Sequence, residues 1–262
     1  MELKTVLLAE SGGIATLTLN RPEKRNAISF ELIDDLTAAL EAARQSASQV
    51  LVLTGAGQAF CSGMDLESLK TLSAEGRSFE ENLKDSETMA RLFRSIYDFP
   101  KPTIAAVNGP AIAGGMGLAT SCDFTLASTE ARFGYTEVRI GFIPAIVSSL
   151  LKRQVGEKHA RDLLLTGRIF GAEEAYRMGL VNEVLEPQKL MPRVRELAAT
   201  LMENSPTSIR LTKALLSEYA RAQLDQEMKL GQEENARIRA TADFREGVTS
   251  FLEKRKPKWT GK

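Results

Sequence analysis

The chain has 262 residues, of which 34 are basic and 34 acidic, so its formal net charge at neutral pH is zero. A balanced charge excludes the strong positive field with which proteins attract nucleic acid or anionic membrane surfaces. Apolar residues make up 43% of the chain, a proportion that supports a large globular core. Two cysteines and one histidine, His159, argue against a disulfide framework, a histidine-based zinc site and a serine–histidine triad.

The elements predicted along the chain are those of an α/β protein. Apolar and β-branched runs predict strands at residues 3–9, 14–19, 50–53, 103–107, 123–127, 132–133 and 180–184. Helical periodicity predicts helices after Ser29, over most of 65–99 with a polar break at 73–78, and over 145–170 and 172–178. From about residue 187 the chain is nearly all helical, and Ser205-Pro206 marks a helix start. We therefore expect an α/β core over residues 1–186 and a helical part over 187–262.

Residues 108–123, NGPAIAGGMGLATSCD, are the most informative segment. They follow the predicted strand at 103–107, turn at Asn108-Gly109, and bring glycines into the first turn of a helix. Glycine leaves the backbone N–H groups accessible, and a helix N-terminus carries partial positive charge. Such a turn can stabilise a phosphate or a developing oxyanion, and the residues of this segment alone do not distinguish these from a turn with no ligand.

Two glycine patterns resemble dinucleotide fingerprints but lack a required glycine. Phe60 stands at the third glycine position of the pattern that begins at Gly55, and Thr120 stands there in the pattern that begins at Gly115. Neither pattern follows the first strand, as a dinucleotide-binding fold requires, and no Gly-Lys-Ser/Thr follows either loop. We therefore expect no nicotinamide, flavin or P-loop nucleotide site.

A set of short motifs, in order along nearly the whole chain, resembles the crotonase (enoyl-CoA hydratase/isomerase) family. The motifs are NRP and RNA at residues 20–27, AFCSGMDL at 59–66, NG with AGG at 108–115, FGYTE at 133–137, GFIP at 141–144, LTG at 165–167, AYRMGLV at 175–181 and FLEKR at 251–255. The resemblance implies a spiral of β-β-α units, followed by C-terminal helices that mediate a homotrimer or a dimer of trimers. It also implies acyl-CoA thioesters as substrates.

The family's shared device is a pair of backbone N–H groups that hold the thioester oxygen as it gains negative charge. By motif position these donors fall on Met64 and Gly114. A backbone donor requires no particular side chain, so Met at position 64 is acceptable, and Gly114 opens the helix whose dipole adds to its N–H.

The resemblance also implies a coenzyme A site. The matching positions are Arg25, Ala27, Ala59, Gly63, Asp65 and Leu66, with Phe251 and Lys254 in the C-terminal region. Lys254 lies in a basic tail, residues 253–262. The alternative interpretation of this tail is a solvated terminus without a ligand. We further place the acyl-group wall at Met89, Leu92, Phe93, Tyr97, Phe142 and Ile146.

Hydratases of this family use two glutamates, and this chain matches only one of the two positions. Glu137, in an apolar and glycine-spaced neighbourhood, matches the second; we expect burial to raise its pKa towards neutrality, as suits a general acid/base. The alternative role for Glu137 is a structural ion pair. Gly117 stands where the first glutamate belongs and leaves either room for a bulkier acyl group or a site with one carboxylate.

These observations leave the reaction open between two alternatives. The overall resemblance favours a 2-enoyl-CoA hydratase of fatty acid or branched-chain acyl-CoA breakdown, our first choice. The single carboxylate favours a Δ3-Δ2-enoyl-CoA isomerase, which needs one group to take and return a proton. A catalytically weak acyl-CoA-binding scaffold is the third reading.

We expect no metal and no separate cofactor, since coenzyme A is part of the substrate. The N-terminal segment lacks the apolar run of a signal peptide, and no apolar run reaches the length of a membrane span. We therefore expect a cytoplasmic protein without nucleic-acid or membrane partners.

Overall fold

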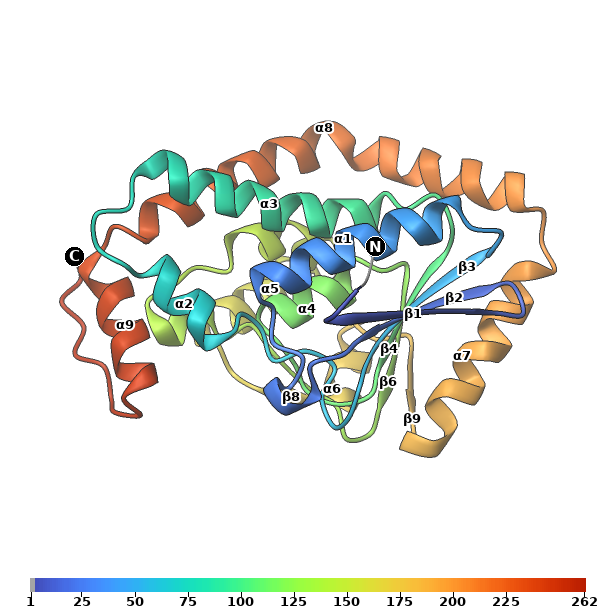
Figure 1. Cartoon of the computed structure of the whole chain (residues 1–262), viewed down its shortest axis with the longest axis horizontal. Coiled ribbons are helices and arrows are strands. Elements are labelled where there is room, and N and C mark those ends of the chain that lie inside the picture. The colour runs from blue at the N-terminus through green and yellow to red at the C-terminus, as the bar shows by residue number, and fades with distance from the viewer. Residues whose placement is uncertain (1–2) are drawn as a thin grey trace.

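The computed structural model describes residues 3–262 and is built around a six-stranded sheet. The strand order is β1-β2-β3-β4-β6-β9 (Figure 1). The strands are β1 (Val6–Ser11), β2 (Ile14–Leu19), β3 (Val50–Gly55), β4 (Thr103–Val107), β6 (Phe124–Ser128) and β9 (Glu183–Leu185). The first two form the predicted antiparallel hairpin, and the remaining pairs are parallel. Each predicted strand is present, with its ends shifted by a few residues.

Helices connect the parallel strands, as parallel pairing requires. They are α1 (Phe30–Gln45), α2 (Leu66–Leu72), α3 (Phe79–Tyr97), α4 (Gly114–Thr120), α5 (Ala145–Thr166) and α6 (Ala172–Arg177). Ser29 caps α1 by accepting from the Leu32 N–H at 3.1 Å, as predicted. The predicted polar break between α2 and α3 is also confirmed, and Ser78 begins α3 with a capping box.

A second, three-stranded sheet joins β5 (Ala111–Ile112), β7 (Arg132–Gly134) and β8 (Phe170–Gly171). Neither β5 nor β8 is predicted from the sequence, because two-residue strands carry no periodicity. The helix expected over 145–170 ends at Thr166, where Gly167 adopts a left-handed φ of 59°. The small sheet matters for function because β5 leads directly into α4.

The central strands β3, β4 and β6 are buried on both faces, and the C-terminal helix α7 (Pro187–Met202) covers one face. Leu190, Val194 and Ala198 of α7 share one apolar cluster with residues of β3, β4 and β6. A larger cluster on the other face includes α1, α3 and α5. The boundary at residue 187 therefore marks a change in composition and does not separate two cores.

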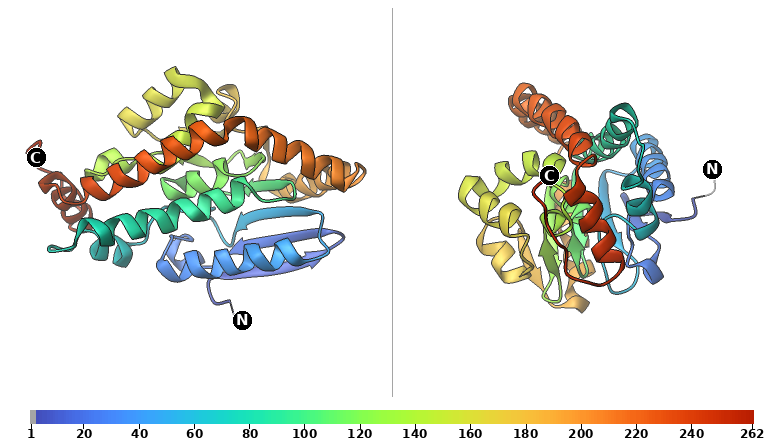
Figure 2. Two further views of the ribbon diagram at one scale, coloured as in Figure 1. Left: turned by 90° about the horizontal axis from the view of Figure 1, so that it is seen from above. Right: turned by 90° about the vertical axis from the view of Figure 1, so that its left-hand side faces the viewer.

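The long helix α8 (Pro206–Ile238) crosses the molecule beside α3 and α5 (Figure 1). Figure 2 shows α8 lying over both, with α9 (Ala242–Leu252) at one end of the molecule. Ser205 caps α8 and Pro206 occupies its first turn, as predicted. Helix α9 thereby comes to lie beside η2 (Glu137–Ile140) and α2.

The basic C-terminal tail is tied to α9. Glu246 forms a bidentate ion pair with Arg255 at 2.6 and 2.8 Å and accepts from the Lys258 N–H at 2.7 Å. Asp243 accepts from the Thr260 N–H at 2.7 Å. The tail is thus a folded strap with several exposed cations.

Candidate active site

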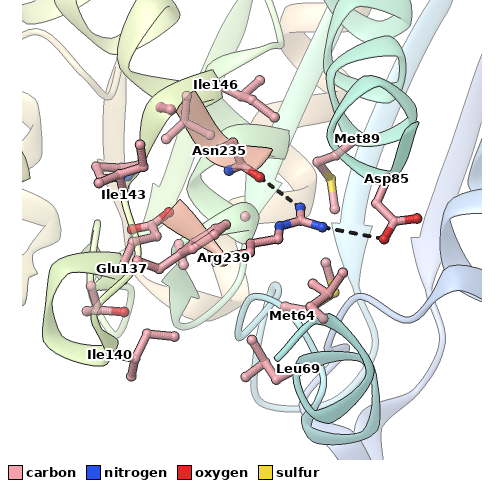
Figure 3. A pocket seen from close by; sticks show the side chains of 18 of the residues that line it. Met64, Leu69, Asp85, Met89, Glu137, Ile140, Ile143, Ile146, Asn235 and Arg239 are labelled. Atoms are coloured by element: carbon pink, nitrogen blue, oxygen red, sulfur yellow. Dashed lines mark hydrogen bonds and ion pairs between the residues drawn. The ribbon is translucent and has the colours of Figure 1, made fainter. Parts of the chain in front are cut away.

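A cavity of about 170 Å³ lies where α2, α3, α4, η2, α8 and α9 meet. Its walls are largely apolar, with side chains such as Leu69, Met89, Ile140 and Ile146 around it (Figure 3). Among residues 3–262, the acidic side chains that line it are Asp85 and Glu137.

The predicted oxyanion donors, Met64 and Gly114, both line this cavity. Within residues 3–262, the backbone N–H groups of Met64 and Gly114 donate no hydrogen bond to the protein. Both residues are partly exposed and line the cavity, so their free N–H groups are open to a ligand oxygen.

Backbone contacts fix the two donor loops against each other. The Ile112 N–H donates to the Cys61 carbonyl at 2.9 Å, and Cys61 pairs with Ala111 as an isolated bridge. A Cβ at Gly115 would lie 2.2 Å from the same Cys61 oxygen, so glycine is required for this approach. The distance between the donors is therefore set by rigid backbone.

Ala113 makes the turn that presents the Gly114 N–H. Its φ is 50° and its ψ is −116°, a conformation that residues with a Cβ rarely adopt. Backbone strain of this kind persists where the surroundings enforce it and clusters at functional sites. Here the Ala113 N–H is held by the Gly134 carbonyl at 2.7 Å.

Glu137 begins η2 and lies in the cavity wall with 8% of its surface exposed. Burial raises the pKa of its carboxyl group to about 7, since the carboxylate is poorly solvated. Its Oε2 atom has no hydrogen-bond partner among residues 3–262. Within the same residues, Glu137 forms no ion pair.

Gly117 lies in α4 and is buried behind the cavity lining. A Cβ there would lie 2.5 Å from Cζ of Phe93 and 2.7 Å from Cγ1 of Val147. Phe93 and Val147 themselves line the cavity. These side chains fill the space into which a side chain at position 117 would extend.

Most positions predicted to bind coenzyme A lie together in the structure. The Ser62 N–H donates to the Arg25 carbonyl at 3.1 Å, and Asn26 Nδ2 donates to the Ala59 carbonyl at 2.8 Å. Arg25 is exposed with a left-handed φ of 52°, whereas Ala27 and Ala59 are buried. Gly63 adopts a φ of 89° and lies against Ile112 and Ala113.

The side chain of Asp65 has a structural role. Its carboxylate caps α2 by accepting from the Ser68 N–H at 2.8 Å, and it pairs with Arg21 at 3.0 Å. These contacts hold the pKa of Asp65 below its usual range despite burial. Leu66, the next residue, is half-exposed.

The predicted C-terminal positions fall near the cavity mouth. Phe251 of α9 lines the cavity and is half-exposed, as is appropriate for an entrance. Lys254 follows it, with its N–H donating to the Phe251 carbonyl at 3.2 Å. Phe142 also lines the cavity and packs on Phe244 with ring centroids 5.0 Å apart. Of the predicted acyl wall, Met89, Phe93, Phe142 and Ile146 line the cavity.

Three polar residues of the cavity were not predicted from the sequence: Asp85, Asn235 and Arg239. Figure 3 shows the guanidinium of Arg239 between Asn235 and Asp85. Arg239 is nearly buried and ends the long helix α8. No local motif marks these residues, because α8 reaches α3 only through the tertiary fold.

The family model described as "Enoyl-CoA hydratase/isomerase" matches residues 9–262. The chain belongs to the enoyl-CoA hydratase/isomerase family. A "Putative enoyl-CoA hydratase" of Thermus thermophilus is 46% identical over 95% of this chain and 98% of its own. A short-chain-enoyl-CoA hydratase of Clostridium acetobutylicum is 35% identical over 98% of this chain and 97% of its own.

Solved structures agree with this membership of the enoyl-CoA hydratase/isomerase family. A crystal structure of an enoyl-CoA hydratase from Mycobacterium avium superimposes with a TM-score of 0.86, at 34% identity over 98% of this chain and 99% of that one. The predicted crotonase-type α/β fold and the predicted enzyme class are therefore confirmed. Within residues 3–262, no helix combines the length and apolarity of a membrane span, and no three His, Cys, Asp or Glu side chains gather as metal ligands.

Proposed function

We propose that the enzyme adds water to 2-enoyl-CoA thioesters, with Glu137 as its acid/base and the Met64 and Gly114 N–H groups as its oxyanion donors. The observation that carries this proposal is the shared cavity. A buried carboxyl group lines it together with two backbone donors, and within residues 3–262 neither Oε2 of the carboxyl group nor the two donors have a partner. The names of the relatives, including the short-chain-enoyl-CoA hydratase, support hydration over other reactions.

One carboxyl group can carry both proton transfers of hydration. Ionised Glu137 takes a proton from water as the water oxygen bonds to C3 of the enoyl group. The C2=C3 electron pair moves into the thioester, whose oxygen becomes negative and is held by the two backbone N–H groups. Protonated Glu137 then gives its proton to C2, which restores the thioester and completes the addition of one water molecule.

The same arrangement supports a second reaction, Δ3-Δ2 isomerisation. The position of Gly117, closed off by Phe93 and Val147, favours it, because a second carboxylate cannot be built there without displacing those side chains. In this reaction Glu137 takes a proton from C2 of a 3-enoyl-CoA and returns it to C4.

A paired assay tests the proposal. Purified enzyme is given a short 2-enoyl-CoA in one arm and the 3-enoyl isomer in the other. Glu137→Gln is the active-site variant, and Glu173→Gln, at an exposed position of α6, is its matched control.

We expect hydration that Glu137→Gln lowers by about 10²- to 10⁴-fold, the usual contribution of a general acid/base. Isomerisation without hydration would show that the enzyme is a Δ3-Δ2-enoyl-CoA isomerase and not a hydratase. Activity that Glu137→Gln leaves unchanged would assign the proton transfer to another group. No activity of the unaltered protein in either arm would support the scaffold reading.

We propose that the exposed apolar stripe of α8 forms the oligomer interface. Leu211, Leu215 and Tyr219 lie four residues apart, on one side of the helix, and each is more than half exposed. Apolar side chains clustered in this way mark protein contacts. A homotrimer or a dimer of trimers, expected from the family resemblance, would bury them.

We propose that Arg25 and Lys254, both exposed, contact the nucleotide, and that the backbone around Gly63 and Leu66 contacts the pantetheine. The buried free thiols of Cys61 and Cys122 are consistent with a reducing cytoplasm.

A further inference from the structure

The cavity holds an arginine that the proposed reaction does not use. The side chain of Arg239 is 4% exposed, and its guanidinium lies among apolar side chains of the cavity wall (Figure 3). Nη2 donates to Asn235 Oδ1 at 2.8 Å and to Ser86 Oγ at 3.2 Å. Nη1 reaches Asp85 Oδ2 at 3.4 Å, a long contact. A pocket for a plain hydrocarbon chain gains nothing from such a group.

The charges around Arg239 do not cancel. Asp85 is shared, because its Oδ2 atom also pairs with Arg77, whose Nε donates to Asn82. Two guanidinium groups therefore face one carboxylate. Burial lowers the pKa of Arg239 to about 10, so the group is still charged near neutral pH. The cluster carries one positive charge in excess next to the cavity.

Two hydrogen-bond donors of this cluster are without acceptors in residues 3–262. Nε of Arg239 is buried and unpartnered. Asn235 accepts through Oδ1 from both Ser86 and Arg239, which fixes its amide and leaves Nδ2 turned away from the guanidinium (Figure 3). A buried unsatisfied donor, Nε of Arg239, beside an excess positive charge requires an explanation.

We propose that the acyl pocket takes an enoyl group whose far end carries a carboxylate, which Arg239 and Asn235 bind. The substrates would then be mono-CoA thioesters of short unsaturated dicarboxylic acids. The carboxylate would neutralise the excess positive charge of the Arg77–Asp85–Arg239 cluster. It would also accept a hydrogen bond from Nδ2 of Asn235. This inference rests on the proposed function, because it places the reacting double bond beside Glu137.

Binding of two saturated thioesters tests the inference without depending on turnover. The mono-CoA thioester of pentanedioic acid and the CoA thioester of pentanoic acid share their CoA part and their chain length. We expect calorimetry to show at least about tenfold tighter binding of the first, as a hydrogen-bonded charge pair provides.

Three variants assign the preference to Arg239. Arg239→Met should remove it, and Arg239→Lys should retain part of it. Arg153→Met is the matched control, because Arg153 also forms a largely buried ion pair, with Glu227 of α8, but does not line the cavity. It should leave the ratio of the two affinities unchanged.

Asp85→Asn provides a second test of the inference if Arg239→Met does not fold. It removes the carboxylate that partly neutralises Arg239, so it should increase the preference for the dicarboxylic thioester. Equal or tighter binding of the pentanoyl thioester by the unaltered enzyme would overturn the inference. So would an affinity ratio that Arg239→Met leaves unchanged.

Hydration assays separate this outcome from that of the proposed function. Hydration of pent-2-enoyl-CoA that depends on Glu137, together with no preference for the dicarboxylic thioester, would leave the function standing and remove the inference. A clear binding preference without hydration of either 2-enoyl thioester would support the carboxylate site and refute the proposed hydration.

Discussion

Gly117 and Phe93 lie so close that a Cβ added to Gly117 would stand 2.5 Å from Cζ of Phe93. Phe93 is itself fully buried, and Val147 confines the same space at 2.7 Å. The glycine is therefore a packing requirement of the contact between α3 and α4. It is not an open place left by a missing side chain.

We predict that Gly117→Glu does not add a second catalytic carboxylate. Even Gly117→Ala should lower the free energy of unfolding by about 1–3 kcal/mol, the usual effect of overpacking. In a Phe93→Leu background the same alanine should have a smaller effect, because the clashing ring atoms are gone. Urea unfolding of the four proteins measures this coupling, and strictly additive effects would contradict it.

The pH dependence of activity should follow the ionisation of Glu137. Burial raises the pKa of its carboxyl group to about 7, and the group must be ionised to accept a proton from water. We predict that kcat/KM for hydration rises as pH passes through about 7 and then levels off. A profile that is flat from pH 5 to pH 8 would assign the proton transfer to another group.

The same burial should make Glu137 unfavourable for stability at high pH. Below pH 4.5 the carboxyl group is protonated in both the folded and the unfolded chain, so it has no effect. As pH rises from 4.5 to about 7, the unfolded chain ionises first, and stability falls. Above about pH 7 the loss is complete, at about 3 kcal/mol for a shift of this size.

Glu137→Gln should therefore be more stable than the unaltered enzyme at pH 8 but not at pH 4. Denaturant unfolding at several pH values measures the difference, which should change by about 3 kcal/mol across this range. Glu173→Gln, at its exposed position, should show no such change. If the curves of Glu137→Gln and the unaltered enzyme run parallel, Glu137 is not buried as described.

The two contacts of Asp65 can be separated by substitution. Asp65→Asn keeps a good helix cap for α2 but loses the ion pair with Arg21. Because this pair is largely buried, we expect a loss of about 3 kcal/mol of stability. Asp65→Ala loses both, and a further loss of about 1 kcal/mol should follow. Thermal unfolding would check the order, and equal effects of the two variants would show that the cap contributes nothing.

A charge in the exposed stripe of α8 should disrupt assembly. We predict that Leu215→Glu with Tyr219→Glu converts an oligomer into monomers in light scattering, because a buried apolar interface excludes charge. Leu7→Glu, at a half-exposed position of β1, is the matched control and should not change the mass. A monomeric unaltered enzyme would refute the proposed interface directly.

The sequence by itself determined those features that depend on neighbouring residues. Ser29, Ser205 and Pro206 begin helices through contacts within one turn, and the alternation of residues 14–19 predicts their strand. The resemblance to the family could also be recognised from the sequence, because the ordered glycine motifs mark where backbone segments turn and approach each other.

Only the tertiary structure decided what the cavity contains. Phe93 closes the space at Gly117 from a different helix, and α8 brings Arg239 and Asn235 to α3 across most of the chain. The pKa of Glu137 depends on how completely the surrounding elements exclude water from it. Such contacts join residues far apart in the chain, so no local pattern encodes them, and the size, charge and protonation of this site follow from packing.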